Sequence, residues 1–334
     1  MSGNHSGEVV VVTGASAGLG RAIVREFAKR RARIGLIARN RERLEQARSE
    51  VESAGGEALV LPADVADAGQ VEAAAERVER ELGPIDIWVN DAMATIFAPF
   101  LEIRPEEFKR ATEVTYLGFV YGTMSALRRM KPRDRGTIVQ VGSALAYRSI
   151  PLQSAYCGAK HAMVGFTDSI RSELLHDNSH VHLTVVHVPA MNTPQFSWCR
   201  SRLPRHPQPV PPIYQPEVAA RAVVWAAYQK RREVLIGWPT VAVINGQKVL
   251  PGLADRYLAA HGYDSQQTAE PVPADRPDNL FESVEGDFAA HGIFDREAKS
   301  ASVQAWLNVH RRAVALITGG VVGLAVLAGR RSAA

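Results

Sequence analysis

The feature that most restricts the fold is a regular alternation of short apolar runs with longer stretches of helical periodicity over the first 236 residues. The helical stretches lie near 18–30, 40–54, 67–82, 105–130, 154–175 and 216–230. The apolar runs, often β-branched, lie near 9–12, 33–37, 57–61, 85–89, 136–141, 182–187 and 233–236. Strands buried on both faces and separated by helices predict a parallel sheet covered on each side. We therefore expect a doubly wound α/β fold of about seven strands with right-handed crossovers.

Composition and charge exclude several classes of protein. The 334 residues are 46% hydrophobic and 22% charged, as expected for a globular chain with a sizeable core. The net charge of +4 forms no basic face interleaved with aromatic residues, so nucleic acid is not an expected partner. Cys157 and Cys199 provide neither a disulfide framework nor a metal site, and the histidines of 176–187 lack companions at ligand spacing. We expect no metal and a reducing, cytoplasmic location.

The chain is expected to divide into three parts. Residues 1–239 form the α/β domain, which includes a Pro-rich segment at 194–216 that we call the lid because loops of this length are often functional. Residues 240–310 form a C-terminal extension that is partly linker-like, polar at 264–300, with a short amphipathic helix near 295–310. Residues 311–334 form an apolar tail.

The tail leaves two interpretations open. Residues 313–329 carry no charge and are bracketed by arginine pairs, and a 17-residue helix spans roughly 25 Å, the lower limit for crossing a bilayer. Four glycines weaken this segment as a membrane span. It either anchors the protein to a membrane or packs on the domain or a neighbouring subunit. The N-terminus has no apolar run typical of a secretory signal.

A glycine-rich turn follows the first expected strand. In TGASAGLG (13–20), Gly14 permits a tight turn, while Gly18 and Gly20 allow the backbone to approach a pyrophosphate and the helix to pack closely. The N–H groups at the start of the next helix attract phosphate. This strand–turn–helix context predicts dinucleotide binding.

The end of the second strand selects the cofactor. A carboxylate there would bind the ribose 2′-hydroxyl and repel a 2′-phosphate. This chain has Ala38 and Arg39 instead, and a guanidinium binds phosphate through bidentate contacts. The sequence therefore predicts NADP(H) rather than NAD(H).

The stretch SAYCGAK places Tyr156 and Lys160 four positions apart, on one face of a helix. Such a pair is weak evidence by itself, because a solvated helix often carries one. Ser143 stands 13 residues before the tyrosine, at the end of the fifth expected strand. Together with the glycine turn, these residues form a pattern that is much more specific than the pair.

The combined motifs resemble those of the short-chain dehydrogenase/reductase family over about residues 8–236. The resemblance implies a Rossmann fold and an oxidoreductase that interconverts an alcohol with a ketone or aldehyde. It implies catalytic roles for Ser143, Tyr156, Lys160 and, by alignment of EVTYLG (113–118), Thr115. It also implies cofactor contacts from Gly14, Ser16, Gly18, Leu19, Gly20, Arg39, Asp64, Val65, Asn90, Tyr156, Lys160 and Thr193.

These roles suggest a proton-transfer device. A free tyrosine has a pKa near 10, and an ammonium at about 4 Å stabilises a phenolate by roughly 4 kcal/mol at an effective dielectric constant of 20. We therefore expect Lys160 to lower the pKa of Tyr156, which would exchange a proton with the substrate oxygen. Ser143 would position that oxygen, and the resemblance implies that Lys160 also holds the nicotinamide ribose.

Two departures from the family pattern affect this expectation. Where the family has Asn-Asn-Ala-Gly, this chain has Asn90-Asp91-Ala92-Met93, so a methionine replaces a glycine close to the nicotinamide. Where the family has a catalytic asparagine that steadies a water in the proton relay, this chain has Thr115. A hydroxyl has fewer hydrogen-bonding atoms than an amide, so we expect an altered relay.

The substrate and the alternatives follow from the remaining residues. Candidate pocket residues are mostly apolar and favour a bulky hydrophobic substrate; they are Met93, Leu145, Tyr147, Met191, Phe196 and Trp198. A non-catalytic dinucleotide-binding scaffold or redox sensor is the alternative that Thr115 suggests, and a membrane-tethered interaction protein using 240–334 is a third. The resemblance implies a homodimer or homotetramer formed through the helices at 105–130 and 154–175.

Overall fold

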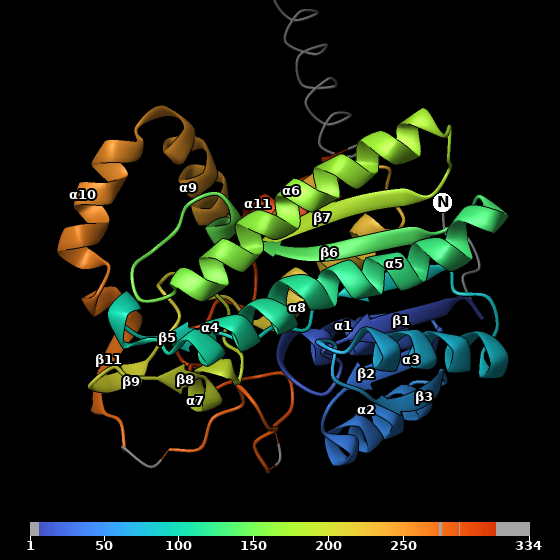
Figure 1. The fold of residues 1–334 in the computed structure, drawn as a ribbon, viewed down its shortest axis with the longest axis horizontal. Coiled ribbons are helices and arrows are strands. Elements are labelled where there is room, and N and C mark those ends of the chain that lie inside the picture. The colour runs from blue at the N-terminus through green and yellow to red at the C-terminus, as the bar shows by residue number, and fades with distance from the viewer. Residues whose placement is uncertain (1–6, 274–275, 287, 312–334) are drawn as a thin grey trace, which may run out of the picture.

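The computed structural model describes residues 7–273, 276–286 and 288–311. Its centre is a seven-stranded parallel sheet in the order β10-β7-β6-β4-β1-β2-β3 (Figure 1). The strands are β1 (Val9–Thr13), β2 (Arg33–Ala38), β3 (Glu57–Pro62), β4 (Ile87–Asn90), β6 (Thr137–Ser143), β7 (His182–Val188) and β10 (Glu233–Leu235). Each lies within about two residues of its expected position, so the prediction of a seven-stranded doubly wound sheet is confirmed.

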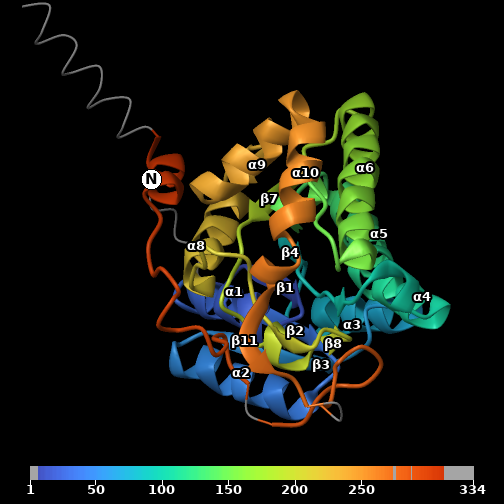
Figure 2. The ribbon, with the colours of Figure 1, turned by 90° about the vertical axis from the view of Figure 1, so that its left-hand side faces the viewer.

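Helices cover both faces of this sheet (Figure 2). One face carries α1 (Gly18–Ala28), α2 (Arg41–Ser53) and α8 (Pro216–Ala227). The other carries α3 (Ala68–Glu81), α4 (Pro105–Thr112), α5 (Gly118–Met130) and α6 (Ser154–His176). All five residues of β1 are buried because Val10 and Val12 pack toward the first group and Val9 and Val11 toward the second. This explains the unbroken apolar run in the sequence.

The helix expected over 105–130 is interrupted. A π-helical turn, Glu113–Leu117, separates α4 from α5. Within this turn the buried hydroxyl of Thr115 donates to the carbonyl oxygen of Ala94 at 2.8 Å and accepts from its N–H at 2.9 Å. The turn therefore fixes the loop that follows β4, and π-helical turns of this kind often lie at functional sites.

The strand order changes direction at β1, which lies between β2 and β4. The chain runs outward through β2 and β3 and then returns to the other side of β1 with β4. In open α/β sheets, ligands bind in the crevice outside the carboxyl ends of the strands at such a point. The glycine turn follows β1 and the loop 91–95 follows β4, so both border this crevice.

The lid is ordered and tied to other parts of the chain. It contains α7 (Gln195–Trp198), β8 (Arg200–Ser201) and β9 (Arg205–Pro207). Strand β8 pairs with β5 (Ile96–Phe97), and β9 pairs antiparallel with β11 (Gln267–Pro271) of the C-terminal extension. These two small sheets hold the lid across the end of the cavity described below.

The extension is more regular than the sequence suggested. It begins with two helices that were not predicted, α9 (Trp238–Val249) and α10 (Pro251–His261), which contact each other. Residues 276–286 and 288–299 then run along the lid as a segment we call the strap. The predicted short helix is present as α11 (Val303–Val309). Among the described helices, none is both long and apolar enough to cross a membrane, and the predicted tail at 313–329 lies outside the described residues.

Candidate active site

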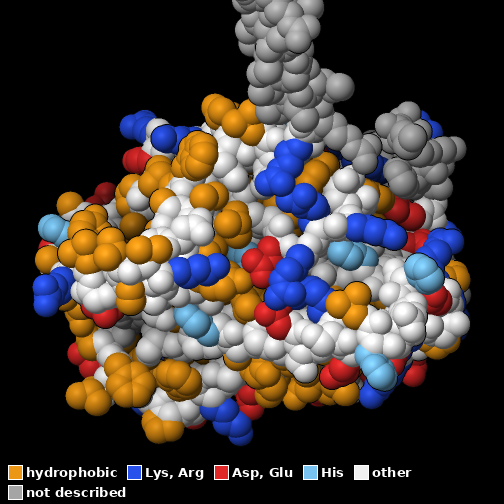
Figure 3. All heavy atoms as spheres, turned by 90° about the horizontal axis from the view of Figure 1, so that it is seen from above, with side chains coloured by type: hydrophobic (Ala, Val, Ile, Leu, Met, Phe, Trp, Pro, Cys, Tyr) orange, Lys and Arg blue, Asp and Glu red, His pale blue; other side chains and the backbone are white. Residues whose placement is uncertain are grey.

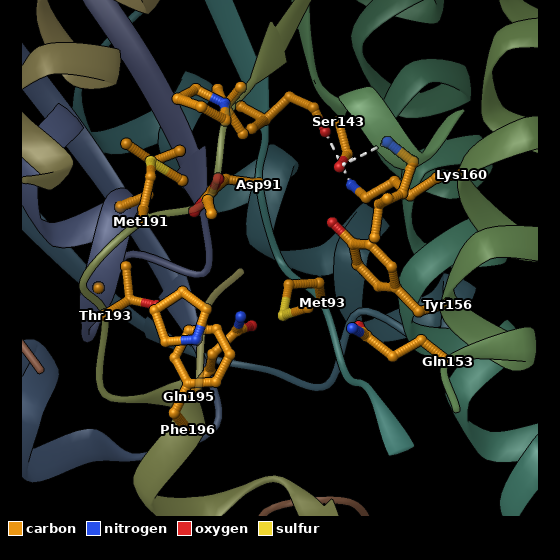
Figure 4. A pocket seen from close by; sticks show the side chains of 18 of the residues that line it. Asp91, Met93, Ser143, Gln153, Tyr156, Lys160, Met191, Thr193, Gln195 and Phe196 are labelled. Carbon is orange, nitrogen blue, oxygen red and sulfur yellow. Dashed lines mark hydrogen bonds between the residues drawn. The ribbon is translucent and has the colours of Figure 1, made fainter. Parts of the chain in front are cut away.

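A cavity of about 720 Å³ lies at the carboxyl ends of β1, β2, β4, β6 and β7. Its walls include the glycine turn, the loop after β4, the start of α6, the lid, the strap and helices α9 and α10. Figure 4 shows Ser143, Tyr156 and Lys160 on one side of it and Asp91, Met191 and Thr193 on the other. The carboxyl-end location agrees with the expected dinucleotide site.

The glycine turn has the geometry of a phosphate cradle. Gly14 has φ +75°, and a Cβ there would meet the backbone N of Ala92 at 3.0 Å. Gly18 has φ +59° and lies beside Thr193, which is one of the predicted cofactor contacts and lines the same cavity. The N–H of Gly18 donates to the carbonyl oxygen of Ala289 in the strap at 2.9 Å. The strap therefore engages one donor of the turn, and a dinucleotide pyrophosphate would bind the N–H groups at the start of α1 that remain free.

The three predicted catalytic side chains come together as expected. Ser143 ends β6, and Tyr156 and Lys160 lie in the first two turns of α6. The Ser143 hydroxyl accepts the N–H of Leu145 at 3.1 Å and lies close enough to the Tyr156 phenol to lower its pKa. Lys160 is 2% exposed, and its Nζ donates to the carbonyl oxygen of Val141 at 2.7 Å. The site therefore presents a phenol and a hydroxyl to one region of the cavity.

The expected effect of Lys160 on Tyr156 is not what the structure shows. Burial raises the pKa of Tyr156 above its ordinary value, and the hydrogen bond from Ser143 only partly opposes that rise. The Nζ atom of Lys160 lies 5.7 Å from the centre of the Tyr156 ring and 4.3 Å from that of Phe119. Because the ammonium is directed to Val141 and Phe119, desolvation prevails and the phenol remains protonated at neutral pH.

Asp91 is a charged member of the site to which the sequence assigned no role. Burial raises the pKa of its carboxyl above the ordinary range, while Lys160 and the N–H of Gly20 oppose that rise. Burial also lowers the pKa of Lys160, and Asp91 opposes that change. Each charge therefore supports the other within the cavity. The sequence could have indicated this role, because Asp91 stands where the family pattern has an asparagine.

Three predicted site residues do not line the cavity, namely Gly20, Asn90 and Thr115. Gly20 packs against the carbonyl oxygen of Gly14, which leaves no room for a side chain. Asn90 is fully buried, and its amide donates to Gln140 at 2.9 Å and Thr123 at 3.2 Å, which joins β4 to β6 and α5. It is thus placed among structural partners and not toward a cofactor. Thr115 is also fully buried, with its hydroxyl engaged by Ala94. The hydroxyl proton of Thr115 is therefore already donated to Ala94, so Thr115 cannot donate a hydrogen bond to a relay water.

The family can now be assigned from comparison with known proteins. A family model for short chain dehydrogenases matches residues 8–202. The chain belongs to the short chain dehydrogenase family.

Members similar to this chain include proteins from bacteria and animals. The chain is 32% identical over 324 residues to the uncharacterized oxidoreductase YxnA of Bacillus subtilis, across 96% of this chain and 88% of that protein. It is 34% identical over 232 residues to the 3-dehydrosphinganine reductase of Danio rerio, across 67% and 69% of the two chains. A crystal structure of a metagenomic short-chain oxidoreductase in complex with NADP matches with TM-score 0.59 and 26% identity, across 70% of this chain and 98% of that one.

Within this dehydrogenase, most of the predicted apolar pocket is present. Met93, Leu145, Met191, Phe196 and Trp198 all line the cavity. Tyr147 is an exception. Its hydroxyl donates to Glu233 at 2.9 Å, and its ring packs at a tilt against that of His187, so its polar end is held outside the cavity.

The opposite end of the cavity contains the predicted adenosine contacts Ser16, Arg39, Asp64 and Val65. Arg39, however, does not point a free guanidinium into it. Its Nη1 donates to the carbonyl oxygen of Phe281 at 2.7 Å and its Nη2 to that of Asn279 at 2.5 Å. The strap therefore closes the end of the cavity at which the adenosine is expected to bind. This closure was missed because the partners lie 240 positions apart in the sequence.

Proposed function

We propose that this protein is an NADP(H)-dependent oxidoreductase that interconverts an alcohol with a ketone or aldehyde on a bulky hydrophobic substrate. The observation that carries the proposal is that Ser143, Tyr156 and Lys160 share one cavity with the glycine turn and with Arg39 at the end of β2. A site with a proton donor at one end and a dinucleotide cradle at the other matches the family chemistry.

The protonation state of Tyr156 favours the reductive direction. A phenol whose pKa is raised holds its proton at neutral pH and can donate it to a carbonyl oxygen held by the Ser143 hydroxyl. The buried ammonium of Lys160 adds positive charge on the side of the cavity where the alkoxide charge would develop. NADPH, when bound, supplies the hydride. The 3-dehydrosphinganine reductase of Danio rerio is also named as a reductase.

Helices α9 and α10 support the assignment of a hydrophobic substrate. Their inner residues, among them Val243 and Leu258, line the cavity. Their outer faces expose Val249 (73%), Leu250 (56%) and Leu253 (62%). Figure 3 shows hydrophobic side chains gathered on the side of the molecule where these helices lie. An apolar wall inside and an apolar surface outside suit a substrate of low water solubility.

A second function is favoured by one observation. The hydroxyl of Thr115 donates to and accepts from Ala94, so it cannot donate to a relay water. A chain that binds the dinucleotide without turnover would act as a scaffold or redox sensor, and this is our alternative.

The remaining proposals concern partners and location. We propose that the protein is cytoplasmic and forms a homodimer or homotetramer through α4, α5 and α6. Residues 313–329, which lie outside the described residues, either contact a membrane or pack on protein. Flotation of the full chain with liposomes and its mass in solution by light scattering test these two proposals. The chain without residues 312–334 is the control for membrane contact.

The test of the proposed function is NADPH consumption by the full chain with a panel of hydrophobic ketones and aldehydes, with NADH in parallel. We expect turnover with NADPH, and a loss of about 10²–10⁴-fold in Tyr156→Phe with unchanged NADP⁺ binding, because the phenol is the proton donor. Equal turnover in Tyr156→Phe would contradict the role of this residue. Tight NADP⁺ binding with no turnover on any carbonyl would favour the scaffold.

A further inference from the structure

Helix α10 is largely apolar, yet the rest of the described chain does not bury it. Figure 1 shows it at the edge of the molecule, next to α9 and away from the central sheet. It contacts α9, and none of its residues is buried by the part of the chain that the structure describes. A helix with apolar side chains on several sides is normally covered. Helix α10 therefore lacks a covering that its sequence calls for.

Four large apolar residues at the junction of α9 and α10 are exposed over more than half of their surface. They are Val249, Leu250, Leu253 and Tyr257, and we call them the apolar ridge. Leu253 and Tyr257 stand four positions apart and share one face of α10. Val249 and Leu250 lie in the connection that leads into this helix. Contiguous exposed apolar surface of this kind marks an interaction site.

The apolar ridge continues into the cavity. Tyr257 belongs to the ridge and also lines the cavity, as does the exposed Val243 of α9. The wall beside them is made of the small residues Ala242, Gly246 and Ala254. A Cβ added at Gly246 would meet no atom within 4 Å, so space is available there. An apolar surface thus runs from the outside of the helix pair into the cavity.

Positive charge borders the ridge. Residues 238–261 include one lysine, one arginine and one acid, which are Lys248, Arg256 and Asp255. The acid is engaged by Arg148 at 2.6 Å, whereas Lys248 and Arg256 are exposed. Apolar side chains flanked by cations are typical of helices that lie in the interface of a membrane. Lipids with anionic headgroups attract such cations.

The same charge argues against two other coverings of the ridge. The tail, 311–334, contains four arginines and no acid, so it would add to the positive charge instead of neutralising it. A second copy of the chain related by a two-fold axis would bring the same ridge and the same two cations, Lys248 and Arg256, against their counterparts. An anionic bilayer offers acyl chains to the ridge and phosphate groups to the cations.

The end of the described chain also lies near α9. In α11, Gln304 accepts the N–H of Gly237 at 2.6 Å and Asn308 donates to the carbonyl oxygen of Leu235 at 3.1 Å. These bonds hold α11 at the start of α9, and the described chain ends at Arg311. The uncharged run 313–329 follows directly in the sequence. A bilayer that receives this run would therefore lie close to α9.

We propose that the apolar ridge is a docking surface for an anionic lipid bilayer, with Lys248 and Arg256 against the lipid phosphates. Docking would place Tyr257, and with it the apolar wall of the cavity, at the membrane surface. An apolar substrate would then pass between the bilayer and the cavity without crossing water. This passage rests on the proposed function, whereas docking itself does not.

The test uses full-chain variants in which an added tryptophan reports contact with lipid. Leu253→Trp places it on the ridge, and Leu175→Trp is the matched control because Leu175, 71% exposed against 62%, lies at the far end of α6. The vesicles consist of brominated phosphatidylcholine, which quenches tryptophan, with about one third phosphatidylserine. Relative to wild type, we expect quenching at least about threefold stronger in Leu253→Trp than in Leu175→Trp, because apolar ridge side chains enter the interface.

The cations provide a second variant. In the Leu253→Trp background, Lys248→Gln combined with Arg256→Gln should weaken vesicle binding about 10-fold or more, because two attractions to anionic lipid are lost. Lys109→Gln combined with Arg41→Gln is the control, since these cations are exposed on α4 and α2, and it should leave binding unchanged. Equal binding by the two double variants would contradict the role of Lys248 and Arg256.

Three outcomes of the quenching experiment would overturn the proposal. If the full chain floats with the vesicles but Leu253→Trp is not quenched, the tail alone contacts the membrane. If the added tryptophan is shielded without vesicles, and increasingly so as the protein concentration rises, a second copy covers the ridge. Shielding without vesicles at every protein concentration would show that the tail covers it.

The passage of substrate is tested separately with Leu253→Glu, because Leu253 does not line the cavity. We expect kcat/KM for a long-chain ketone carried in the vesicles to fall about 10-fold or more, and the rate with a short water-soluble ketone to stay within about threefold of wild type. Equal losses with both ketones would overturn the passage. If wild type reduces neither ketone, the proposed function fails, and the quenching experiment still decides whether the ridge docks.

Discussion

The two ends of the cavity are built in different ways. At the catalytic end, Ser143, Tyr156 and Lys160 lie within 18 positions of one another, on β6 and the start of α6. The charge of the lysine is balanced there by Asp91. At the adenosine end, Arg39 and Arg43 form no salt bridge among the described residues, although the charge of Asp64 raises the pKa of Arg39, and the lid and strap close over both arginines. The catalytic end is arranged to transfer a proton, and the adenosine end is arranged to attract an anion. Mutations at the two ends should therefore change kcat and cofactor affinity separately.

The largest effect is expected from the lysine at the catalytic end. Lys160→Met removes the buried ammonium, and we expect kcat to fall by at least about 100-fold while preference for NADP⁺ over NAD⁺ is kept. Initial rates with saturating NADPH measure this. Lys109→Met is the matched control, because Lys109 is on α4 with a side chain that is 76% exposed. If Lys160→Met keeps a turnover within threefold of wild type, the ammonium of Lys160 is not needed for catalysis and this division between the two ends is contradicted.

The next effect tests the closure of the adenosine end. The buried carboxylate of Glu107 in α4 accepts from Arg200 at 2.6 Å and Arg202 at 2.7 Å, which joins the lid to the domain. We expect Glu107→Gln to lower the free energy of unfolding by about 3 kcal/mol, because the partly buried guanidinium groups of Arg200 and Arg202 both lose a charged partner, although Arg200 keeps Asp278 at 2.6 Å. Urea unfolding measures this. Glu106→Gln, whose side chain is 57% exposed, is the control.

The same carboxylate predicts a pH dependence. Burial alone would raise the pKa of Glu107, but the bonds from Arg202 and the N–H of Arg104 outweigh it and lower the pKa to about 2 from 4.5. A lowered folded-state pKa adds stability that is complete above the unfolded value and is lost as the pH falls from about 4.5 toward 2. Wild type should lose this stability in that window and Glu107→Gln should not. Parallel acid titrations of the two proteins would refute the assignment.

The smallest effect concerns the acid near the lysine. Asp91 raises the pKa of Lys160, so Asp91→Asn should lower it and move the alkaline limb of the kcat/KM profile to lower pH, by up to about one unit. The rate at neutral pH should change by less than about threefold. Asp264→Asn, with a side chain that is 81% exposed, is the control. An unshifted limb would mean that the charge of Asp91 does not act on the lysine.

The two ends also differ in how well the sequence predicts them. The sheet, its flanking helices and the Ser143–Tyr156–Lys160 group follow from short-range patterns, because each residue is placed by the strand or helix that carries it. The sequence did not predict that Nζ of Lys160 donates to Val141, because this orientation depends on the burial of the lysine and on the residues packed around it. The strap could not be predicted, because its bonds to Arg39 join backbone carbonyls, which carry no residue-specific signal, across about 240 positions. Helices α9 and α10 were missed because the βα alternation ends before them.

The central claim, that one cavity separates proton transfer from cofactor selection, is tested most directly by titrating NADPH in the steady state for Tyr156→Phe and Arg39→Gln beside wild type. The account predicts that Tyr156→Phe loses about 10²–10⁴-fold in kcat and keeps its apparent affinity for NADPH. Arg39→Gln should lose about 10–100-fold in apparent affinity and recover a kcat within about threefold of wild type at saturation. If Arg39→Gln instead lowers kcat at saturating NADPH as strongly as Tyr156→Phe does, the two ends do not act separately and the account is wrong.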